Sequence, residues 1–368
     1  MDNPLKGTRI EYHILQSFPV TCLNRDDVGS PKTAYIGGCQ RGRVSSQCWK
    51  RQIRTTLKDM GVTIGIRTKD IEKLIHEALE AAGANPEQAE SCARQAAAAL
   101  TEKTLLFFSR SEADVIAKFA KDHGFDPAAL IKGAPAKKEE SDGKGKAKKA
   151  ELATELVKLL KAGLNPALDG LDIALFGRMA AQVPEMNMQA AASVAHAITT
   201  HECANEIDFF TALDDFQTSE PGSAHMGSLE FNSGTYYRYI SLDLGQLAEN
   251  LHGHELGKAV KDFTYALYQA VPAARQTTQT GMHPWDHARV LVRKGQGMQA
   301  SFDQPVKSKN GYLKPSIEEL DRQLERNRRV SGSLYGELAS YTLGDEECEN
   351  IDILADALAK HAEKGSIQ

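Results

Sequence analysis

The chain has 368 residues, of which 41% are hydrophobic and 25% are charged, and its formal net charge at pH 7 is −5. This composition is ordinary for a soluble globular protein, and a chain of this length can bury a core without disulfides or a structural metal. Its six cysteines form no CxxC pair and follow no regular spacing, which argues against a zinc site and against a disulfide framework.

No segment is typical of a targeting or membrane sequence. The first residues, MDNPLKGTRIEYHIL, lack the pattern of a signal peptide. No apolar run approaches the roughly 20 residues that a membrane helix needs. We therefore expect a soluble, cytoplasmic protein that has no membrane partner.

The first two elements are expected to be a strand and a helix. Residues 9–16 alternate between apolar and polar side chains, which predicts a strand. A loop punctuated by Gly and Pro follows at residues 18–42. Either Ser45 or Ser46 can then cap the start of a helix. The apolar face of this helix consists of Trp49, Ile53, Leu57 and Met60.

The same stretch carries a concentration of positive charge. Residues 28–58 contain no acidic residue and seven basic ones, namely Lys32, Arg41, Arg43, Lys50, Arg51, Arg54 and Lys58. A helix face that is merely solvated usually mixes both signs, so we favour a polyanion site over a solvated basic face, with a nucleic-acid backbone as the leading candidate. Ser45, Gln47 and the amides of the first helical turn would donate to phosphate oxygens. Charge would come from Lys50, Arg51 and Arg54.

A long helical block follows. Its Ala-rich pattern predicts helices at residues 71–82, 86–100, 111–121 and 150–161. In its middle, KGAPAKKEESDGKGKAKK at residues 132–149 has almost no apolar content and is expected to form a mobile loop.

Short apolar runs return after this block. We interpret the runs at residues 171–176, 193–200, 235–242 and 289–293 as strands. Residues 255–271 place apolar side chains on one helical stripe, and two further helices are expected near residues 316–329 and 346–360.

Without insertions, the predicted order is strand, helix, strand, strand, helix, strand. This is the split βαβ, or ferredoxin-like, arrangement shared by many RNA-binding domains, and it makes the fold class α+β. The helical block at residues 64–190 is then a large insertion. A second insertion at residues 203–234, rich in Asp, Ser and Gly, would project between two strands.

Few side chains suggest a metal or an active site. His283 and His287 are four residues apart, a spacing that suits a metal on a helix. The intervening Pro284 favours a loop instead, and no third ligand is identifiable, so we predict no metal and no cofactor. Asp26 and Asp27 are candidates for general-base or metal-binding carboxylates, or alternatively cap a turn.

Several segments together resemble one known family. They are CLNRDD with PKTAYIGG, RGRVSSQCWKRQIR, DIALFGRMA, SVAHAITTHE, IDFFTALDD, GSAHMGSLEF with SGTYYRY, and GYLKPSI, and they run from the first strand to about residue 317. In this order they closely resemble the CasC-type backbone subunit of the type I-E CRISPR surveillance complex, Cascade.

The resemblance implies an RRM-like palm with a helical fingers insertion and a protruding thumb loop or hairpin. On this chain the palm would comprise residues 1–63, 191–202 and 235–368, the last of these including the C-terminal helices. The fingers would comprise residues 64–190, and the thumb residues 203–234.

The resemblance also implies a non-enzymatic function. Subunits of this family stack as a filament along a CRISPR guide RNA, and each palm grips the guide backbone. The thumb of one subunit displaces a guide base at regular intervals and leaves the segments between free to pair with target DNA. The implied partners are the guide RNA, target DNA through the guide, further copies of this chain and the other Cascade subunits.

Site residues carry over from the matching motifs. The guide-backbone grip is matched by Ser45, Gln47, Lys50 and Arg51, with Arg54 on the same face. Arg25 and Lys32 lie in the matching loop, and Arg43 is a further expected RNA-binding residue. Met179, Thr211 and Met226 match the residues that flank a displaced nucleotide, and Arg178 and His225 are further expected RNA-binding residues. Basic fingers positions that would contact duplex DNA are Lys148, Lys149, Lys158 and Lys161, although the loop before them is longer than in the family and partly acidic.

Two other functions stay open at this point. One is an endoribonuclease on a similar fold, because some related filament subunits in other CRISPR types cleave target RNA with a loop aspartate. Asp26 or Asp27 would serve in that role. The other is a general single-strand binder without preference for a guide.

Overall fold

The computed structural model describes residues 3–101, 104–132, 151–163, 170–212, 225–346 and 348–364. The chain divides into two compact units, which we describe separately. The sheet unit comprises Met1–Met60, Ala192–Gly245 and Leu256–Ser366, and the helical unit comprises Gly61–Ala191, Gln246–Glu255 and Ile367–Gln368. The mobile loop predicted at residues 132–149 lies, apart from its first residue, outside the described residues.

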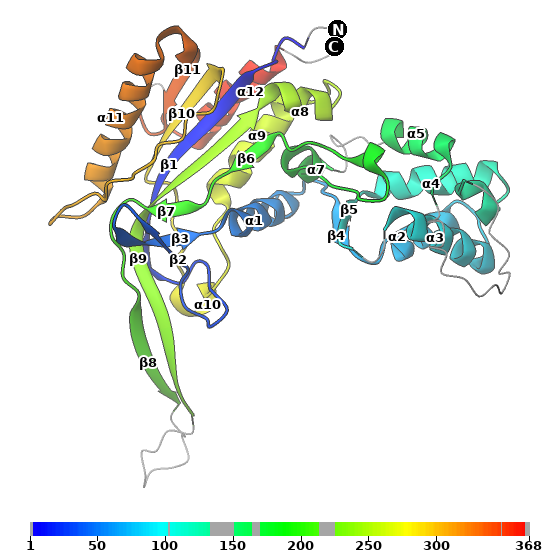
Figure 1. Cartoon of the computed structure of the whole chain (residues 1–368), viewed down its shortest axis with the longest axis horizontal. Helices are drawn as coiled ribbons and strands as arrows, with labels where there is room; N and C mark the ends of the chain where they lie inside the picture. The colour runs from blue at the N-terminus through cyan, green and yellow to red at the C-terminus, as the bar shows by residue number, and fades with distance from the viewer. Residues whose placement is uncertain are drawn as a thin grey trace, which may run out of the picture. The chain divides into compact units, whose positions relative to one another are not determined.

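The sheet unit is built on an antiparallel sheet with the strand order β11-β10-β1-β9-β7-β3-β2 (Figure 1). Its central strand β1 (Thr8–Thr21) pairs with β10 (His287–Lys294) on one side and with β9 (His225–Asp243) on the other. The other strands are β11 (Glu337–Thr342), β7 (Ala197–Thr199), β3 (Cys39–Val44), β2 (Thr33–Ile36), β6 (Ala192–Val194) and β8 (Glu206–Ala212), of which the last two also pair with β9.

Helices α1 (Ser46–Asp59) and α9 (Leu256–Gln269) cover one face of this sheet. On that face the Tyr12 hydroxyl lies 2.9 Å from Thr264 Oγ1, and the Tyr12 ring meets Phe263 edge-on at 6.3 Å. Trp49 of α1 stacks on the guanidinium of Arg238, whose carbon lies 3.6 Å from the ring centroid. This contact fixes α1 against the sheet through an aromatic and a cationic side chain that are both buried.

Helix α11 (Leu313–Ser331) contributes to the core on the opposite face. There Leu320 and Leu324 pack in one cluster with Leu15, Tyr239 and Phe302. β1 is therefore buried on both faces, which is why its sequence shows a shorter alternating pattern than the strand that forms.

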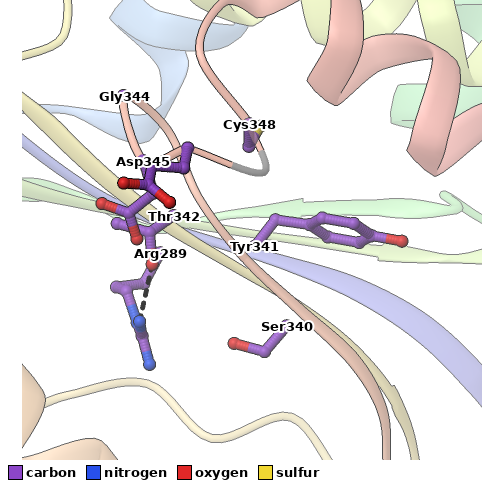
Figure 2. A pocket seen from close by; sticks show the side chains of 8 residues that line it. Arg289, Ser340, Tyr341, Thr342, Gly344, Asp345 and Cys348 are labelled. Atoms are coloured by element: carbon purple, nitrogen blue, oxygen red, sulfur yellow. Dashed lines mark hydrogen bonds between the residues drawn. The ribbon is translucent and has the colours of Figure 1, made fainter.

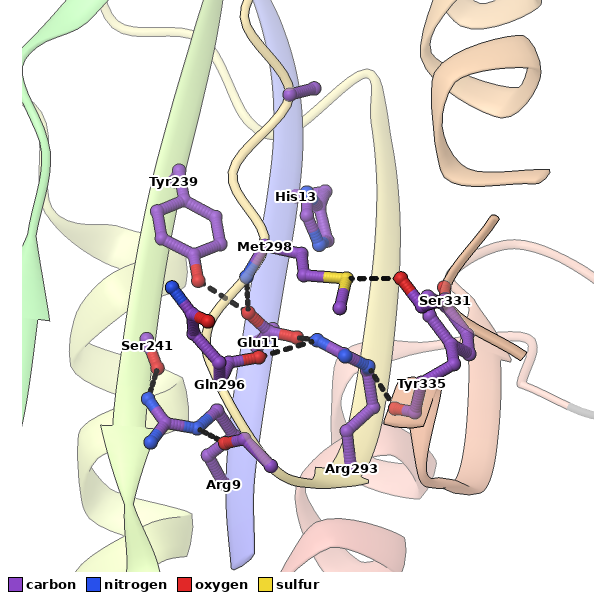
Figure 3. A network of polar contacts seen from close by, with 12 residues as sticks. Arg9, Glu11, His13, Tyr239, Ser241, Arg293, Gln296, Met298, Ser331 and Tyr335 are labelled. Carbon is purple, nitrogen blue, oxygen red and sulfur yellow. Dashed lines mark hydrogen bonds and ion pairs between the residues drawn. The ribbon is translucent and has the colours of Figure 1, made fainter. Parts of the chain in front are cut away.

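A buried polar network lies on the α11 side of the sheet (Figure 3). Glu11 accepts hydrogen bonds from the Tyr239 hydroxyl and from the Met298 amide at 2.7 Å, and it pairs with Arg293. Burial raises the pKa of Glu11, but the bonds from Tyr239, Met298 and Arg293 outweigh it and hold the pKa below its usual value. The network thus holds a charged carboxylate in the core and ties the Met298 segment to β1 and β10.

The prediction of a loop at residues 18–42 is wrong in part. β1 continues to Thr21, and β2 and β3 form a hairpin in the same stretch. Gly37 and Gly38 make its two-residue turn with φ values of 62° and 81°, which favour glycine. A Cβ on Gly37 would lie 1.7 Å from the Asp303 carbonyl oxygen, so the turn also packs against the chain where only glycine fits.

The predicted second insertion at residues 203–234 contains a two-stranded ribbon. β8 pairs with the first part of β9, so that Thr211 lies opposite Met226 and Ala212 opposite His225. β9 then continues without interruption into the sheet. Ile207 and Phe209 on β8 are largely exposed.

The remaining helices of the sheet unit come from the carboxyl-terminal half of the chain. They are α10 (Gln276–Gln279), α11 and α12 (Ile351–Glu363), of which α12 packs against α9. The short helix α8 (Leu244–Asn250) spans the boundary between the two units in the sequence. The helices predicted near residues 255–271, 316–329 and 346–360 are all confirmed, within a few residues.

The helical unit packs α2 (Ile71–Ala81), α3 (Pro86–Leu100), α4 (Arg110–Asp122) and α5 (Thr154–Gly163) around one core. The short strands β4 (Ile66–Thr68) and β5 (Leu106–Phe108) pair with each other. Asn85 and Ser109 begin α3 and α4 with complete capping boxes, each with a side chain three residues on that returns the bond.

The apolar run at residues 171–176 was predicted as a strand, and that prediction is wrong. It forms a helix, α7 (Leu171–Phe176), between Gly170 and Gly177, and its first five residues are buried. A run of six residues with five apolar side chains has no recognisable period, so its sequence does not separate a buried strand from a buried helix turn. Among the described residues, none of the helices is long and apolar enough to cross a membrane.

Candidate nucleic-acid interface

The start of α1 is organised by Ser45, which is the N-cap. Its Oγ accepts a hydrogen bond from the Cys48 amide at 3.2 Å, and its own amide donates to Asn24 Oδ1 at 3.0 Å. The first turn holds no acidic residue, so the partial positive charge of the helix start is not neutralised by its own side chains. Ser45 itself is buried, and its role in the fold is to shape this end of the helix.

The faces of α1 divide as the sequence predicts. Trp49, Ile53 and Leu57 are buried, while Gln47 and Arg51 are exposed. Two further residues of the predicted set, Lys50 and Arg54, are half-buried. Desolvation by burial lowers the pKa of Lys50.

A histidine from a distant part of the sequence, His196, joins this end of the helix. The Ser46 amide donates to His196 Nδ1 at 3.2 Å. Burial lowers the pKa of His196, and the nearby charges of Arg43 and Lys32 lower it further. His196 thus contacts the start of α1 and feels the charges of Lys32 and Arg43. No local signal in the sequence links residue 196 to residue 46, because the sheet alone brings them together.

Arg41, although part of the acid-free stretch, belongs to the core. Its side chain is fully buried, and it donates to the carbonyl oxygens of Thr199 at 2.7 Å and Phe302 at 3.1 Å. Arg43 is half-buried and its Nε donates to the Thr33 carbonyl at 3.2 Å. The basic stretch therefore combines structural cations with cations at the surface.

A cleft of about 740 Å³ lies beside α1. It is lined by residues 23–29, by Cys48, Arg51, Gln52 and Thr55 of α1, and by Ala273 and Ala274. Arg25 and Arg51 thus reach one cleft from different segments. Their guanidinium groups can bind phosphate oxygens in bidentate fashion, which makes this cleft suited to a sugar-phosphate backbone.

Asp26 and Asp27 line the same cleft. Asp26 Oδ1 accepts hydrogen bonds from the amides of Val28 at 3.0 Å and Ser30 at 2.9 Å, so this carboxylate caps a turn, as one of the two interpretations expected. Within the described residues, no group of three or more His, Cys, Asp or Glu side chains is placed to hold a metal ion.

The histidines weighed as metal ligands have other contacts. His283 Nε2 lies 2.9 Å from Asp286 Oδ1, and Asp286 Oδ2 accepts the Ser17 amide at 2.6 Å. This pair therefore joins the loop before β10 to the end of β1. His287 is paired in the sheet opposite Leu15.

The residues predicted to flank a displaced nucleotide lie in both units. Met179 follows α7 in the helical unit and is 79% exposed, whereas its neighbour Arg178 is buried and paired with Glu112. Thr211 is exposed on β8 of the sheet unit, directly opposite Met226 in the ribbon. Arg178 therefore has no exposed guanidinium to offer a nucleic acid, which corrects its assignment as a direct contact.

The basic positions assigned to duplex DNA are partly described. Lys158 and Lys161 are exposed on α5. Lys148 and Lys149 lie outside the described residues.

Another cavity, of about 510 Å³, lies beside β11 (Figure 2). Arg289 Nη1 donates to Thr342 Oγ1 at 2.6 Å there, and Asp345 lies on the same side. None of the residues predicted from the sequence lines this cavity. Arg25 and Arg51 of the predicted set meet in the cleft beside α1, whereas Lys161 and Arg178 line a smaller cavity of about 250 Å³ in the helical unit.

Comparisons with a family model and with solved structures found proteins similar to this chain. A family model described as "CT1975-like protein" matches residues 10–361. A solved chain described as "CRISPR RNA-guided surveillance complex, pre-nicking" is 28% identical, with a TM-score of 0.76 over 96% of this chain and 100% of that one. Another, described as "CRISPR RNA-guided surveillance complex", is 24% identical, with a TM-score of 0.67 over 97% and 100%, and that likeness shows the fold. A search of curated protein sequences gave no match.

Proposed function

We propose that this chain, which belongs to the CT1975-like family of Cas proteins, is a non-catalytic scaffold that holds the guide RNA of a CRISPR surveillance complex. The complex would be a type I-E Cascade. Copies of the chain would line up along one guide, displace a base at intervals and leave the others to pair with target DNA. The further partners would be the other Cascade subunits.

The observation that carries this proposal is the acid-free start of α1 beside the Arg25–Arg51 cleft. Exposed Gln47 and Arg51, with Lys32 and Arg43 near His196, form a positive surface on a chain whose net charge is negative. The 28% identical chain of an RNA-guided surveillance complex supports a guide RNA as the polyanion.

The proposed RRM-like palm is supported by the strand order. Within the sheet, β10, β1, β9 and β7 are consecutive neighbours, with α1 and α9 on one face. In chain order these strands are fourth, first, third and second of the predicted split βαβ pattern. The helical unit and the β8–β9 ribbon would then serve as fingers and thumb.

The chemistry of the cleft suits a grip on phosphates rather than on bases. A guide that is read by base pairing must keep its base edges free, so the protein needs amides and cations aimed at the backbone. Such binding does not depend on sequence and weakens with salt.

The test is guide binding by the Lys50→Ala, Arg51→Ala double variant as a function of salt. Losing two phosphate contacts on a single strand makes the log–log salt slope shallower by about 1.4. The matched control is Lys314→Ala with Arg326→Ala, which removes the same charges from exposed positions on α11, a helix that packs on the other face of the sheet. Equal slopes for both double variants would disprove the backbone grip.

Varying the length of the guide tests whether copies of the chain form a filament along it. If copies assemble along the guide, native mass spectrometry shows the number bound rising in steps as the guide is lengthened. Competition with an unrelated RNA of equal length, in the presence of the other subunits, separates a guide scaffold from a general single-strand binder. An unrelated RNA that competes equally well supports the general binder.

A nuclease is the second candidate, because Asp26 and Asp27 lie in the cleft that also holds Arg25 and Arg51. Its test is incubation of the guide-loaded protein with complementary RNA and Mg²⁺ or Mn²⁺. The scaffold proposal expects intact RNA. Regular cuts that disappear in Asp27→Asn would establish the nuclease instead, with Asp26→Asn reporting separately on the turn that Asp26 caps.

A further inference from the structure

The segment after α7 presents one large apolar side chain to solvent between two buried residues. Met179 is 79% exposed, whereas Arg178 and Ala180 on either side of it are 7% and 1% exposed. An exposed methionine has three rotatable side-chain bonds and samples several rotamers. Here the backbone on both sides is anchored.

The backbone anchors are hydrogen bonds and a glycine. Arg178 and Met188 exchange both main-chain hydrogen bonds, at 2.9 and 3.0 Å, and form an isolated antiparallel bridge. The Ala180 amide donates to Asn187 Oδ1 at 2.6 Å. Gly177 has a φ of 77°, and a Cβ there would lie 2.9 Å from the Met188 carbonyl oxygen. The chain is therefore held by hydrogen bonds on both sides of Met179.

The side-chain anchor is the guanidinium of Arg178. Its Nη1 donates to both carboxylate oxygens of Glu112, at 2.7 and 2.8 Å, and to the Phe107 carbonyl at 3.2 Å. Its Nε donates to the Met186 carbonyl at 3.0 Å. One side chain thus links α4, β5 and the far side of the loop.

Glu112 is itself held in place. Its Oε2 accepts the Ser109 amide at 2.9 Å in the capping box of α4, and its side chain is fully buried. A buried ion pair is seldom more stable than apolar residues that fill the same space, so stability alone is a weak reason for this arrangement. A pair that fixes a geometry is the better-supported use.

Resting on the proposed function, we infer that the buried Glu112–Arg178 pair positions Met179 against the guide where a base is displaced. Neither member touches RNA. The pair acts through Met179 by holding its backbone, so that less of this segment has to be ordered when the guide binds. Its effect is therefore on the displaced base and not on the grip at α1.

The experiment uses the full chain assembled with its guide, which carries 2-aminopurine at each position of one interval in turn. The fluorescence of this base rises when it leaves the stack, so it reports the ratio of displaced to stacked base. Arg178→Lys keeps the charge beside Glu112 but cannot make all the guanidinium contacts. We expect the ratio to fall about three- to tenfold, the range for ordering one flexible side chain on binding.

Two further variants keep the test independent of folding. Asn187→Ala removes the Ala180 anchor from an exposed position and should lower the ratio in the same direction. Arg110→Lys, the same chemical change at an exposed position of α4, is the matched control and should leave the ratio unchanged. The decisive comparison is with Met179→Ala. If Arg178 acts through Met179, then Arg178→Lys lowers the ratio no further in the Met179→Ala background.

Two results would overturn the inference. One is an unchanged ratio in both Arg178→Lys and Asn187→Ala. The other is an equal loss from Arg178→Lys with and without Met179. A failure of the proposed function looks different, because the guide then fails to bind the unaltered chain or binding ignores the loss of Lys50 and Arg51.

Discussion

Replacing Ser45 by alanine should loosen the start of α1 and weaken guide binding without changing its salt dependence. The Ser45 Oγ is the acceptor for the Cys48 amide, at 3.2 Å, and the site is buried. Loss of such a cap lowers the free energy of unfolding by about 1 kcal/mol, within a usual range of about 0.5–2. For a unit of this size that corresponds to a fall of about 2–4 °C in the unfolding temperature.

The effect on binding has the same source. If the guide binds only to an ordered first turn, part of its binding free energy is spent on ordering that turn once the cap is lost. A loss of about 1 kcal/mol makes the dissociation constant about fivefold larger, since about 1.4 kcal/mol corresponds to a factor of ten. Because Ser45 carries no charge, the number of phosphates neutralised does not change, and neither does the salt slope.

The neighbouring Ser46 is the matched control. Its Oγ donates to Gln47 Oε1 at 3.3 Å, and it occupies the first helical position rather than the cap. Unfolding would be followed by circular dichroism and binding by fluorescence anisotropy with a labelled guide at several salt concentrations. Equal losses in Ser45→Ala and Ser46→Ala, or a shallower salt slope in Ser45→Ala, would refute the reasoning.

Three further predictions concern the sheet unit. Glu11→Gln removes one partner of the buried pair with Arg293 and should lower the free energy of unfolding at pH 7 by about 3 kcal/mol. Because the folded-state pKa of Glu11 is depressed, its contribution is fully present above the unfolded pKa of about 4.3 and is lost as the pH falls through the folded pKa. Urea midpoints of the two proteins should therefore converge below about pH 4, and a difference independent of pH would contradict this. Arg41→Lys should lower the unfolding temperature but leave the salt slope of guide binding unchanged, since Arg41 is buried on carbonyl oxygens; a shallower slope would make it a phosphate contact. Gly37→Ala should destabilise the β2–β3 turn, because its Cβ would fall 1.7 Å from Asp303, whereas Gly38→Ala meets no atom within 4 Å and should cost less; equal midpoints in thermal unfolding would count against this account.

The sequence allowed local features to be predicted well. The helix after Ser45, its apolar face and the helices of the block after residue 69 all follow from caps and from the 3.6-residue period. Where the pattern is short or apolar on every side, prediction failed. The run at residues 171–176 became α7, and Gly37-Gly38 was read as loop punctuation rather than as a hairpin turn.

The candidate site was predictable only as a list of side chains. The charge of Arg41 is visible in the sequence, but its burial depends on carbonyl groups more than 150 residues away. His196 reaches Ser46 only because β6 pairs with β9 and β7 pairs with β3 in the same sheet. Arg178 and Glu112 are likewise 66 residues apart. Contacts of this kind arise from the tertiary fold, and a single sequence carries no local sign of them.

This distribution of charge bears on how the protein would hold a guide. Of the seven cations in the acid-free stretch, Arg41 is buried in the core and Arg43 is half-buried against its own hairpin. One copy therefore offers only a few phosphate contacts, and each is worth a slope of about 0.7 on a single strand. Such a copy should bind weakly alone. Binding of several copies to one guide, with contacts between neighbours, would make the later steps effectively intramolecular and raise the overall affinity without more charge on any copy. The predicted signature is a steep dependence on guide length together with a modest salt slope for each copy, and a lone copy that binds a short guide tightly would contradict it.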